Sequence, residues 1–228
     1  MRFVRQPIKI RIIRLEVEKT TKKHGPLFPD SVRGLIIAPS GGGKTTALIS
    51  MLLSPNGLKF ANLYVYSKSL NQGKYKYLEK VFAGVDEIVY NTFSNNEEII
   101  GPEDAPAHSI MIFDDIAMEN QDIVKDYFSR GRHNGVDSFY LCQSYSQVPK
   151  HLIRDNVNFL MIFKQDHFNL YNIYKSHVNS DTSFEEFTKM CRKCWERDFG
   201  FLIINKDEKM DRGRYKMGFD VIIIPDSF

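Results

Sequence analysis

The sequence predicts an α/β domain whose central sheet is mostly parallel, is flanked by helices and has an antiparallel extension near its C-terminal end. Two observations lead to this prediction. Short apolar segments alternate with segments of helical character along most of the chain, which is the pattern of βαβ units. The last two apolar segments are separated only by a turn, which suits an antiparallel arrangement.

The expected elements begin with a basic strand at 8–15 and a polar, turn-rich loop. Apolar runs bounded by turn residues are typical of buried strands. Further strands are expected at 32–37, 62–67, 87–90, 109–113, 138–142 and 159–163. Helices are expected at 45–53, 75–82, 121–130, 149–154, 170–178 and 183–197. Two last strands, at 199–204 and 219–224, are expected to extend the sheet in antiparallel fashion.

Composition places the chain among ordinary globular proteins. Hydrophobic residues make up 43% of the 228 residues and charged residues 26%, unlike the low hydrophobicity and high charge of disordered chains. Apolar runs stay far below the roughly 20 residues that span a bilayer, and the N-terminus lacks the apolar core of a secretory signal. Three cysteines make no disulfide framework. We therefore expect a protein that is not secreted and has no membrane-spanning segment.

One glycine-rich segment, Ala38-Pro39-Ser40-Gly41-Gly42-Gly43-Lys44-Thr45, lies between an expected strand and an expected helix. It matches the phosphate-binding P-loop pattern G-x-x-x-x-G-K-[ST], except that Ala38 replaces the first glycine. In this pattern backbone N–H groups surround phosphate, Lys44 neutralises the β- and γ-phosphates of ATP, and the Thr45 hydroxyl ligates Mg²⁺. A flexible glycine turn with an incidental lysine is the alternative. The residues expected to bind the nucleotide are Ser40, Gly41, Gly42, Gly43, Lys44, Thr45 and Thr46.

An acidic pair follows an apolar strand. Residues 110–113 run directly into Asp114 and Asp115, so both carboxylates would emerge at the carboxyl end of a buried strand, where ligands bind in open α/β sheets. We assign Asp114 to Mg²⁺ and its water shell, and Asp115 to the proton of the attacking water. A helix N-cap is the alternative role. The P-loop upstream favours catalysis.

The next expected strand ends in Gln143. An amide both donates and accepts hydrogen bonds, so at this place it can contact the γ-phosphate and orient the attacking water. These motifs predict a RecA-like P-loop NTPase in a single domain spanning 1–228. Its expected segments are a basic N-terminal strand and loop (1–30), a nucleotide-binding core (31–165), and C-terminal helices with the sheet extension (166–228).

Four segments occur in the order APSGGGKTT, YSKSLNQGKYKYL, IMIFDDI and SRGRHNGVDSFYLCQSYSQVPKHLIRDNVN, and together span roughly 34–165. In this order they resemble the FtsK/HerA superfamily, and within it the genome-packaging ATPases of double-stranded DNA viruses, including the poxvirus-like, virophage and Polinton-like branches. FtsK-like motors similarly place a glycine-arginine stretch, an apolar strand ending in glutamine and an I-[KR]-x-N element in succession. Members often carry Asp-Glu in the acidic motif, whereas Asp114-Asp115 shortens the expected base by one methylene group.

The resemblance implies a motor that works as a homo-oligomeric ring, a pentamer or hexamer, in which an arginine from one subunit completes the ATP site of its neighbour. Arg130, Arg132 and Arg154 are the candidates, and the first two lie in the matching glycine-arginine stretch. Such an arginine stabilises charge on the transferring phosphoryl group. Each of the three is alternatively a surface ion-pair residue.

The resemblance further implies an ATPase that uses ATP and Mg²⁺ to drive double-stranded DNA into a viral capsid, with capsid vertex proteins as partners. Basic residues gathered in 1–24 and 206–216 suit DNA phosphates, although the net charge of +3 does not by itself predict nucleic-acid binding. The expected location is the virion or an intracellular site of virus assembly, in host cytoplasm or nucleus. The alternatives are a helicase, another DNA pump, or a nucleotide-switched assembly protein that does not hydrolyse ATP.

Overall fold

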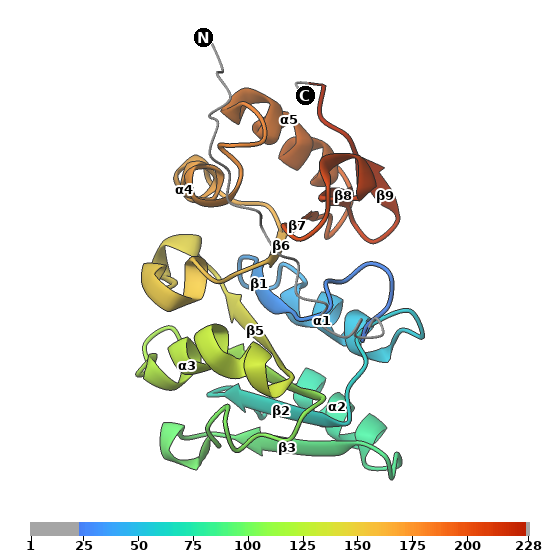
Figure 1. Ribbon diagram of the computed structural model, residues 1–228, viewed down its shortest axis with the longest axis vertical. Coiled ribbons are helices and arrows are strands. Elements are labelled where there is room, and N and C mark those ends of the chain that lie inside the picture. Colours follow the sequence, from blue (N-terminus) through green and yellow to red (C-terminus); the bar gives the residue numbers. More distant parts are fainter. Residues whose placement is uncertain (1–22, 227–228) are drawn as a thin grey trace, which may run out of the picture.

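A nine-stranded sheet runs through residues 23–226, the part of the chain that the computed structural model describes (Figure 1). Its strands lie in the order β3-β2-β4-β5-β1-β6-β7-β8-β9. Parallel pairing joins β1 (Arg33–Ile37), β2 (Asn62–Ser67), β3 (Val89–Phe93), β4 (Ser109–Asp114), β5 (Val136–Cys142) and β6 (Phe159–Ile162). Antiparallel pairing adds β7 (Leu202–Asn205), β8 (Tyr215–Met217) and β9 (Val221–Ile223). The predicted fold class, with its antiparallel extension, is confirmed.

Helices cover both faces of the sheet (Figure 1). On one face lie α1 (Lys44–Leu53) and α2 (Gly73–Phe82). On the other lie α3 (Asp122–Arg130), α4 (His167–His177) and α5 (Phe184–Cys194). Within the described residues, no helix combines the length and the apolar character that crossing a membrane requires.

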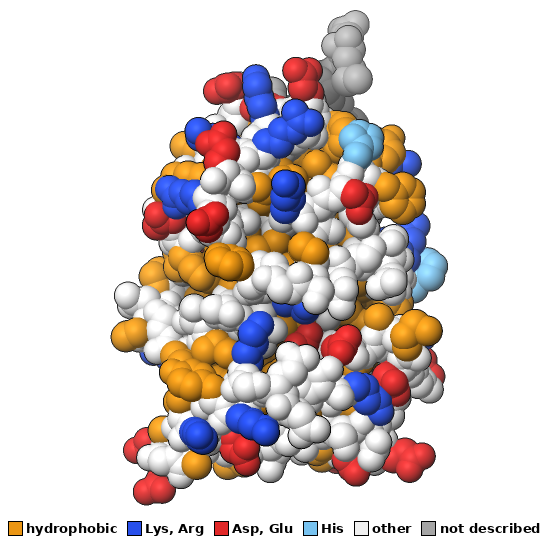
Figure 2. Space-filling view, turned by 180° about the vertical axis from the view of Figure 1, so that it is seen from behind, with side chains coloured by type: hydrophobic (Ala, Val, Ile, Leu, Met, Phe, Trp, Pro, Cys, Tyr) orange, Lys and Arg blue, Asp and Glu red, His pale blue; other side chains and the backbone are white. Residues whose placement is uncertain are grey.

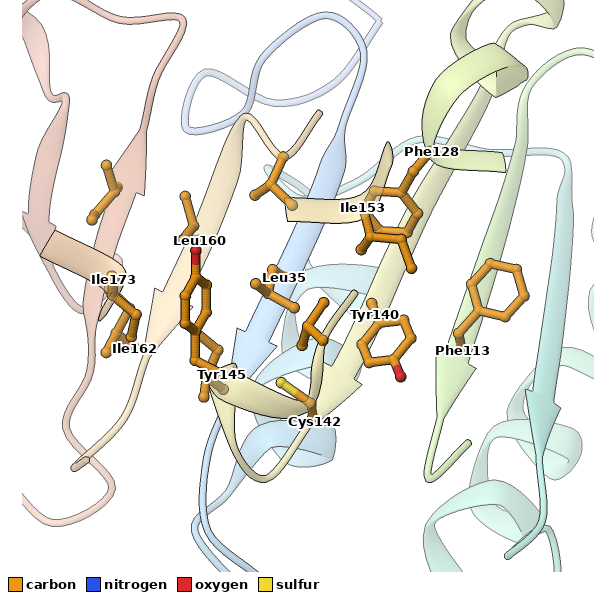
Figure 3. Close-up of a cluster of buried hydrophobic side chains, with 14 of the residues drawn as sticks. Leu35, Phe113, Phe128, Tyr140, Cys142, Tyr145, Ile153, Leu160, Ile162 and Ile173 are labelled. Carbon is orange, nitrogen blue, oxygen red and sulfur yellow. The ribbon is translucent and has the colours of Figure 1, made fainter. Parts of the chain in front are cut away.

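The central strands are buried on both faces, as apolar runs in a parallel sheet predict. Side chains alternate between the faces, so Leu35 packs on the side of α3 and Ile36 on the side of α1. Figure 3 shows the cluster of buried side chains on the side of α3. In it Leu35 lies between Tyr140 of β5 and Leu160 of β6, its register partners on the two neighbouring strands. This packing holds the carboxyl ends of the strands at one edge of the sheet.

A buried carboxylate fastens the segment that precedes β1. Asp137, on β5, is fully buried, and its Oδ2 accepts hydrogen bonds from Lys23 Nζ at 2.7 Å and His24 Nε2 at 2.9 Å. Its Oδ1 accepts from the backbone N–H of Val32 at 2.8 Å. Because His24 Nδ1 accepts from the backbone N–H of Lys59 at 3.0 Å, the imidazole proton lies on Nε2 and points to Asp137. The carboxylate thus receives three donors from one short stretch of chain.

Several elements differ from the sequence-based expectations. The strand expected at 87–90 begins later and forms β3. The sequence does not predict β8, because its three residues follow a turn at Gly213 and have the pattern of a loop. The helix expected at 149–154 is present only as a short, interrupted helical segment, Lys150–Arg154. There His151 is extended and Leu152 has φ 66°, and the side chain of the next residue, Ile153, packs in the core beside α3. The strand expected at 8–15 lies outside the described residues.

Candidate active site

The glycine-rich segment connects β1 to α1 and has the backbone of an anion-binding loop. Gly41 (φ 74°) and Gly43 (φ 98°) occupy the left-handed region, which residues with a Cβ disfavour. The N–H of Gly42 donates to the carbonyl of Pro39 at 3.0 Å, and α1 begins at Lys44 directly after this turn. The first turn of α1 has neither an acidic residue nor a side-chain cap. Its N–H groups and the positive end of its dipole are therefore available to an anion.

Ala38, which stands where the P-loop pattern has its first glycine, belongs to the sheet edge rather than to the turn. Its N–H donates to the carbonyl of Cys142 at 3.1 Å, and its methyl group is buried on the side of α1. It is not among the described residues with positive φ. Alanine is compatible with this position because the backbone there does not require glycine.

Asp114 and Asp115 are neighbours at the carboxyl end of β4 but have different surroundings. Asp114 is 5% exposed; its Oδ2 accepts a hydrogen bond from the hydroxyl of Tyr75, and its buried Oδ1 has no hydrogen-bond partner. Burial raises the pKa of Asp114, while the hydrogen bond from Tyr75 and the charge of Lys44 act to lower it. Asp115 is exposed, has φ 58°, and accepts a hydrogen bond from Ser69 Oγ at 2.7 Å. The pair therefore offers one buried carboxylate with a free oxygen and one carboxylate that faces solvent.

A pocket of about 230 Å³ joins the P-loop to the acidic pair. Its lining includes Lys44, Asp114, Asp115 and Gln143. The sheet order accounts for this convergence, because β5 lies between β1 and β4 and all three strands are parallel. Thr45 is buried in the first turn of α1, whereas Ser40 and Thr46 are exposed on the loop and the helix. The P-loop, the acidic pair and Gln143 thus lie together at one edge of the sheet.

A family match accompanies this geometry. The family model described as poxvirus A32 protein matches residues 22–207 of the chain. The chain belongs to this family. The resemblance to a poxvirus-like family, predicted from four sequence segments, is thereby confirmed. No curated protein sequence matches the chain significantly.

The fold of this A32-family protein is similar to that of genome packaging NTPases. B204 from Sulfolobus turreted icosahedral virus 2, solved with sulfate, has a TM-score of 0.55 and 12% identity over 82% of this chain and 95% of that chain. The same protein with ATP-gammaS has a TM-score of 0.53 and 11% identity, over 82% and 96%. B204 from Sulfolobus turreted icosahedral virus, a DNA-packaging ATPase, has a TM-score of 0.53 and 12% identity, over 83% and 97%. At these identities the likeness shows a shared fold.

The three candidate arginines of this A32-family protein have different surroundings. Arg130 ends α3 and Arg132 lies in the short turn before β5, so both are at the amino edge of the parallel strands, opposite the P-loop. Arg130 is paired with Asp126 at 2.7 Å, whereas Arg132 is exposed and forms no ion pair within the described residues. The guanidinium of Arg154 lies over the ring of Tyr145, 4.9 Å from its centroid. None of the three lines the pocket of its own chain.

The sequence-based expectations give no active-site role to two residues that contact the acidic pair, Ser69 and Tyr75. Tyr75 projects from α2, is 3% exposed and bonds to Asp114, while Ser69 lies between β2 and α2 and bonds to Asp115. The sequence signal for both is their place in YSKSLNQGKYKYL, one of the four family segments. Its mixture of lysine and tyrosine also suits a helix that faces DNA. The burial of Tyr75 excludes that role for this side chain.

Proposed function

We propose that this A32-family protein hydrolyses ATP to move double-stranded DNA into a viral capsid. The pocket in which the P-loop, the acidic pair and Gln143 meet carries the proposal, because phosphoryl transfer needs a phosphate cradle, a carboxylate and a polar group that positions water. Family membership and a fold like that of B204, a genome packaging NTPase, support packaging as the purpose. The protein would act in the virion or where virus particles assemble inside the host cell.

Each polar group then has a separate task. Lys44 neutralises the β- and γ-phosphates, Asp115 accepts the proton of the attacking water, and Gln143 orients that water. The loop from Ser40 to Thr46 holds the phosphates through its backbone N–H groups. Because Asp115 is exposed, it is accessible to a water that enters the pocket from solvent.

The residues around Asp114 fit a magnesium ion. Its Oδ1 is buried without a partner, and such an oxygen is destabilising unless a cation or a water satisfies it. The hydroxyl of Tyr75 holds the other carboxylate oxygen, which leaves Oδ1 as the free one. Carboxylate and hydroxyl oxygens suit Mg²⁺, so Asp114 and Thr45 would hold the ion. When bound, it would neutralise charge on the β- and γ-phosphates.

The placement of Arg130 and Arg132 supports a ring. The length of the strands separates both from their own pocket, so a catalytic role requires the ATP site of a neighbouring subunit. Head-to-tail contacts of identical subunits close into rings, here a pentamer or hexamer. We favour Arg132, because Arg130 is already paired with Asp126. Capsid vertex proteins would hold the ring where DNA enters, and the subunits would grip DNA through its phosphates.

Long duplex DNA is expected to raise the ATP hydrolysis rate of the full chain at low salt. The stimulation is expected to fall steeply as salt rises, because contacts with phosphates release counterions. Phosphate release with and without duplex DNA of random sequence measures it, and single-stranded DNA of equal length is the control. A rate that duplex DNA leaves unchanged at every salt concentration would contradict the translocase.

Mixing two inactive variants is expected to restore ATP hydrolysis if Arg132 acts across the subunit boundary. In a mixture of Arg132→Ala and Lys44→Ala chains, a site with intact Lys44 can receive an intact Arg132 from its neighbour. With random assembly of equal amounts, roughly one site in four is complete. Arg192→Ala, which removes an exposed arginine from α5, is the control and is expected to be active alone. A mixture no more active than its components would exclude Arg132 from the role in trans.

A further inference from the structure

A second pocket lies beside the P-loop, and no catalytic residue lines it. Its volume is about 410 Å³. The lining consists of Gly41, Gly43, Thr46, Ala47, Ser50, Lys74, Phe163, Phe199, Phe201 and Phe219. Four phenylalanines thus meet the loop and the first turns of α1. Because Lys44 and the acidic pair line the other pocket, the P-loop has a polar pocket on one side and an aromatic pocket on the other.

One of the four phenylalanines lies near the end of the nucleotide-binding core, and the other three come from the C-terminal part of the chain. Phe163 follows β6, Phe201 precedes β7, and Phe219 lies between β8 and β9. The ring of Phe201 packs against Phe163 with centroids 5.0 Å apart and against Phe219 with centroids 5.1 Å apart. These three rings form the wall of the pocket. The antiparallel extension therefore supplies most of its aromatic surface.

Phe199 differs from the other three because its side chain is largely exposed. It is 70% exposed, although most of the other phenylalanines that the structure describes are buried. Exposed hydrophobic side chains between charged groups are visible on the back of the molecule (Figure 2). Within the described residues, Phe199 makes no ring pair with another aromatic side chain. A Cβ placed on Gly43 would lie 3.3 Å from its Cδ1, so the ring borders the P-loop directly.

The backbone of Phe199 is strained. Its φ of 54° lies in the left-handed region, which is unfavourable for a bulky side chain and persists only where surrounding structure imposes it. The turn after α5 imposes it: the N–H of Gly200 donates to the carbonyl of Arg197 at 2.9 Å. A Cβ on Gly200 would overlap the carbonyl oxygen of Cys194 at 2.0 Å, so the chain passes too close to α5 for any other residue. The fold thus holds an exposed aromatic ring beside the phosphate loop at a cost in strain.

The two pockets determine how a nucleotide would lie. A triphosphate on the P-loop would direct its terminal phosphate to Lys44 and the acidic pair, on the side of β4 and β5. Its nucleoside would then leave the loop toward β6 and β7, which lie on the other side of β1. The aromatic pocket is on that side, and its phenylalanine lining suits a ligand group with flat apolar faces.

We propose that the aromatic pocket binds the nucleobase of the bound nucleoside triphosphate, with Phe199 as the ring on which the base stacks. This inference rests on the proposed function, because it describes the remainder of the same nucleotide site. Among the lining residues only Thr46, Ser50 and Lys74 have polar side chains, and the hydroxyl of Ser50 already donates to the carbonyl of Thr46 at 3.0 Å. Stacking on aromatic rings accepts every base. The pocket therefore binds adenine and guanine with similar affinity.

Three probes separate base binding from phosphate binding: ATP, GTP and inorganic tripolyphosphate, which has no base. In the Phe199→Ala protein, affinity for ATP and GTP is expected to fall roughly tenfold or more, while affinity for tripolyphosphate stays unchanged. Phe199→Trp is expected to keep the affinity for both nucleotides. Phe168→Ala is the matched control, because Phe168 is 64% exposed on α4 and does not line the pocket. Calorimetry on the full chain, with thermal melting to verify folding, provides these affinities.

Two results would overturn the base site: unchanged ATP affinity in Phe199→Ala, or an equal loss for all three probes, which would place the effect on the P-loop. For the wild-type chain, the affinities for ATP and GTP are expected to lie within roughly tenfold of each other, because an apolar pocket discriminates weakly. A larger preference for either base would contradict the proposal that the pocket does not select between bases. The measurement needs neither DNA nor hydrolysis, so a failure of the translocase proposal would not by itself produce any of these results.

Discussion

Replacing Lys44 with alanine is expected to lower the rate of ATP hydrolysis by roughly a thousandfold, because the charge that meets the developing negative charge of the phosphates is lost. Lys44 is the first residue of α1 and lines the pocket that also contains Asp114 and Gln143. In this confined site a fixed cation stabilises charge far more than it would in water. Steady-state phosphate release at saturating ATP measures the effect.

The variant is expected to fold normally. Lys44 is only half-buried and accepts alanine, a good helix former, at the start of α1. Lys80→Ala is the matched control, because Lys80 is an exposed lysine in the last turn of α2 and should leave hydrolysis unchanged. A Lys44→Ala protein with wild-type hydrolysis would contradict the ATP site. A wild-type chain that bound ATP and supported capsid assembly without hydrolysing ATP would instead favour the role as a nucleotide-switched assembly protein.

Replacing Asp137 with alanine is expected to lower the free energy of unfolding by about 3–5 kcal/mol. The carboxylate is fully buried and receives hydrogen bonds from Lys23, His24 and the backbone of Val32. Removing it leaves a partly buried ammonium group, an imidazole and a backbone N–H without their acceptor. Urea unfolding followed by circular dichroism, extrapolated to water, measures the loss.

An exposed carboxylate provides the comparison for Asp137. Glu196 pairs with Lys193 at 2.7 Å, but both side chains are mostly exposed, so Glu196→Ala is expected to cost less than about 1 kcal/mol. The contrast tests whether burial makes the Asp137 cluster important. Equal losses in the two variants would show that the cluster adds no more stability than a surface ion pair.

The convergence of Lys44, Asp114 and Gln143 in one pocket could be predicted because each residue follows a strand or loop whose pattern is local. Apolar runs identify the strands, and the carboxyl ends of parallel strands meet at one edge of a sheet. The alternation of elements therefore predicts that the side chains after the strands are neighbours. The helix expected at 149–154 is interrupted at His151 and Leu152, and the contact of Ile153 with the core is one that a local pattern does not contain.

The sequence by itself determined the class of fold, the phosphate loop, the acidic pair and the family segments, because these are patterns of neighbouring residues. Only the tertiary structure decided which distant groups complete them. It showed Tyr75 bonded to Asp114, Arg132 at the edge opposite the P-loop, and Phe199 beside Gly43. Such contacts depend on the order of the strands in the sheet and on how the helices pack across it. That order comes from the summed burial of the two cores, which no local stretch of sequence contains.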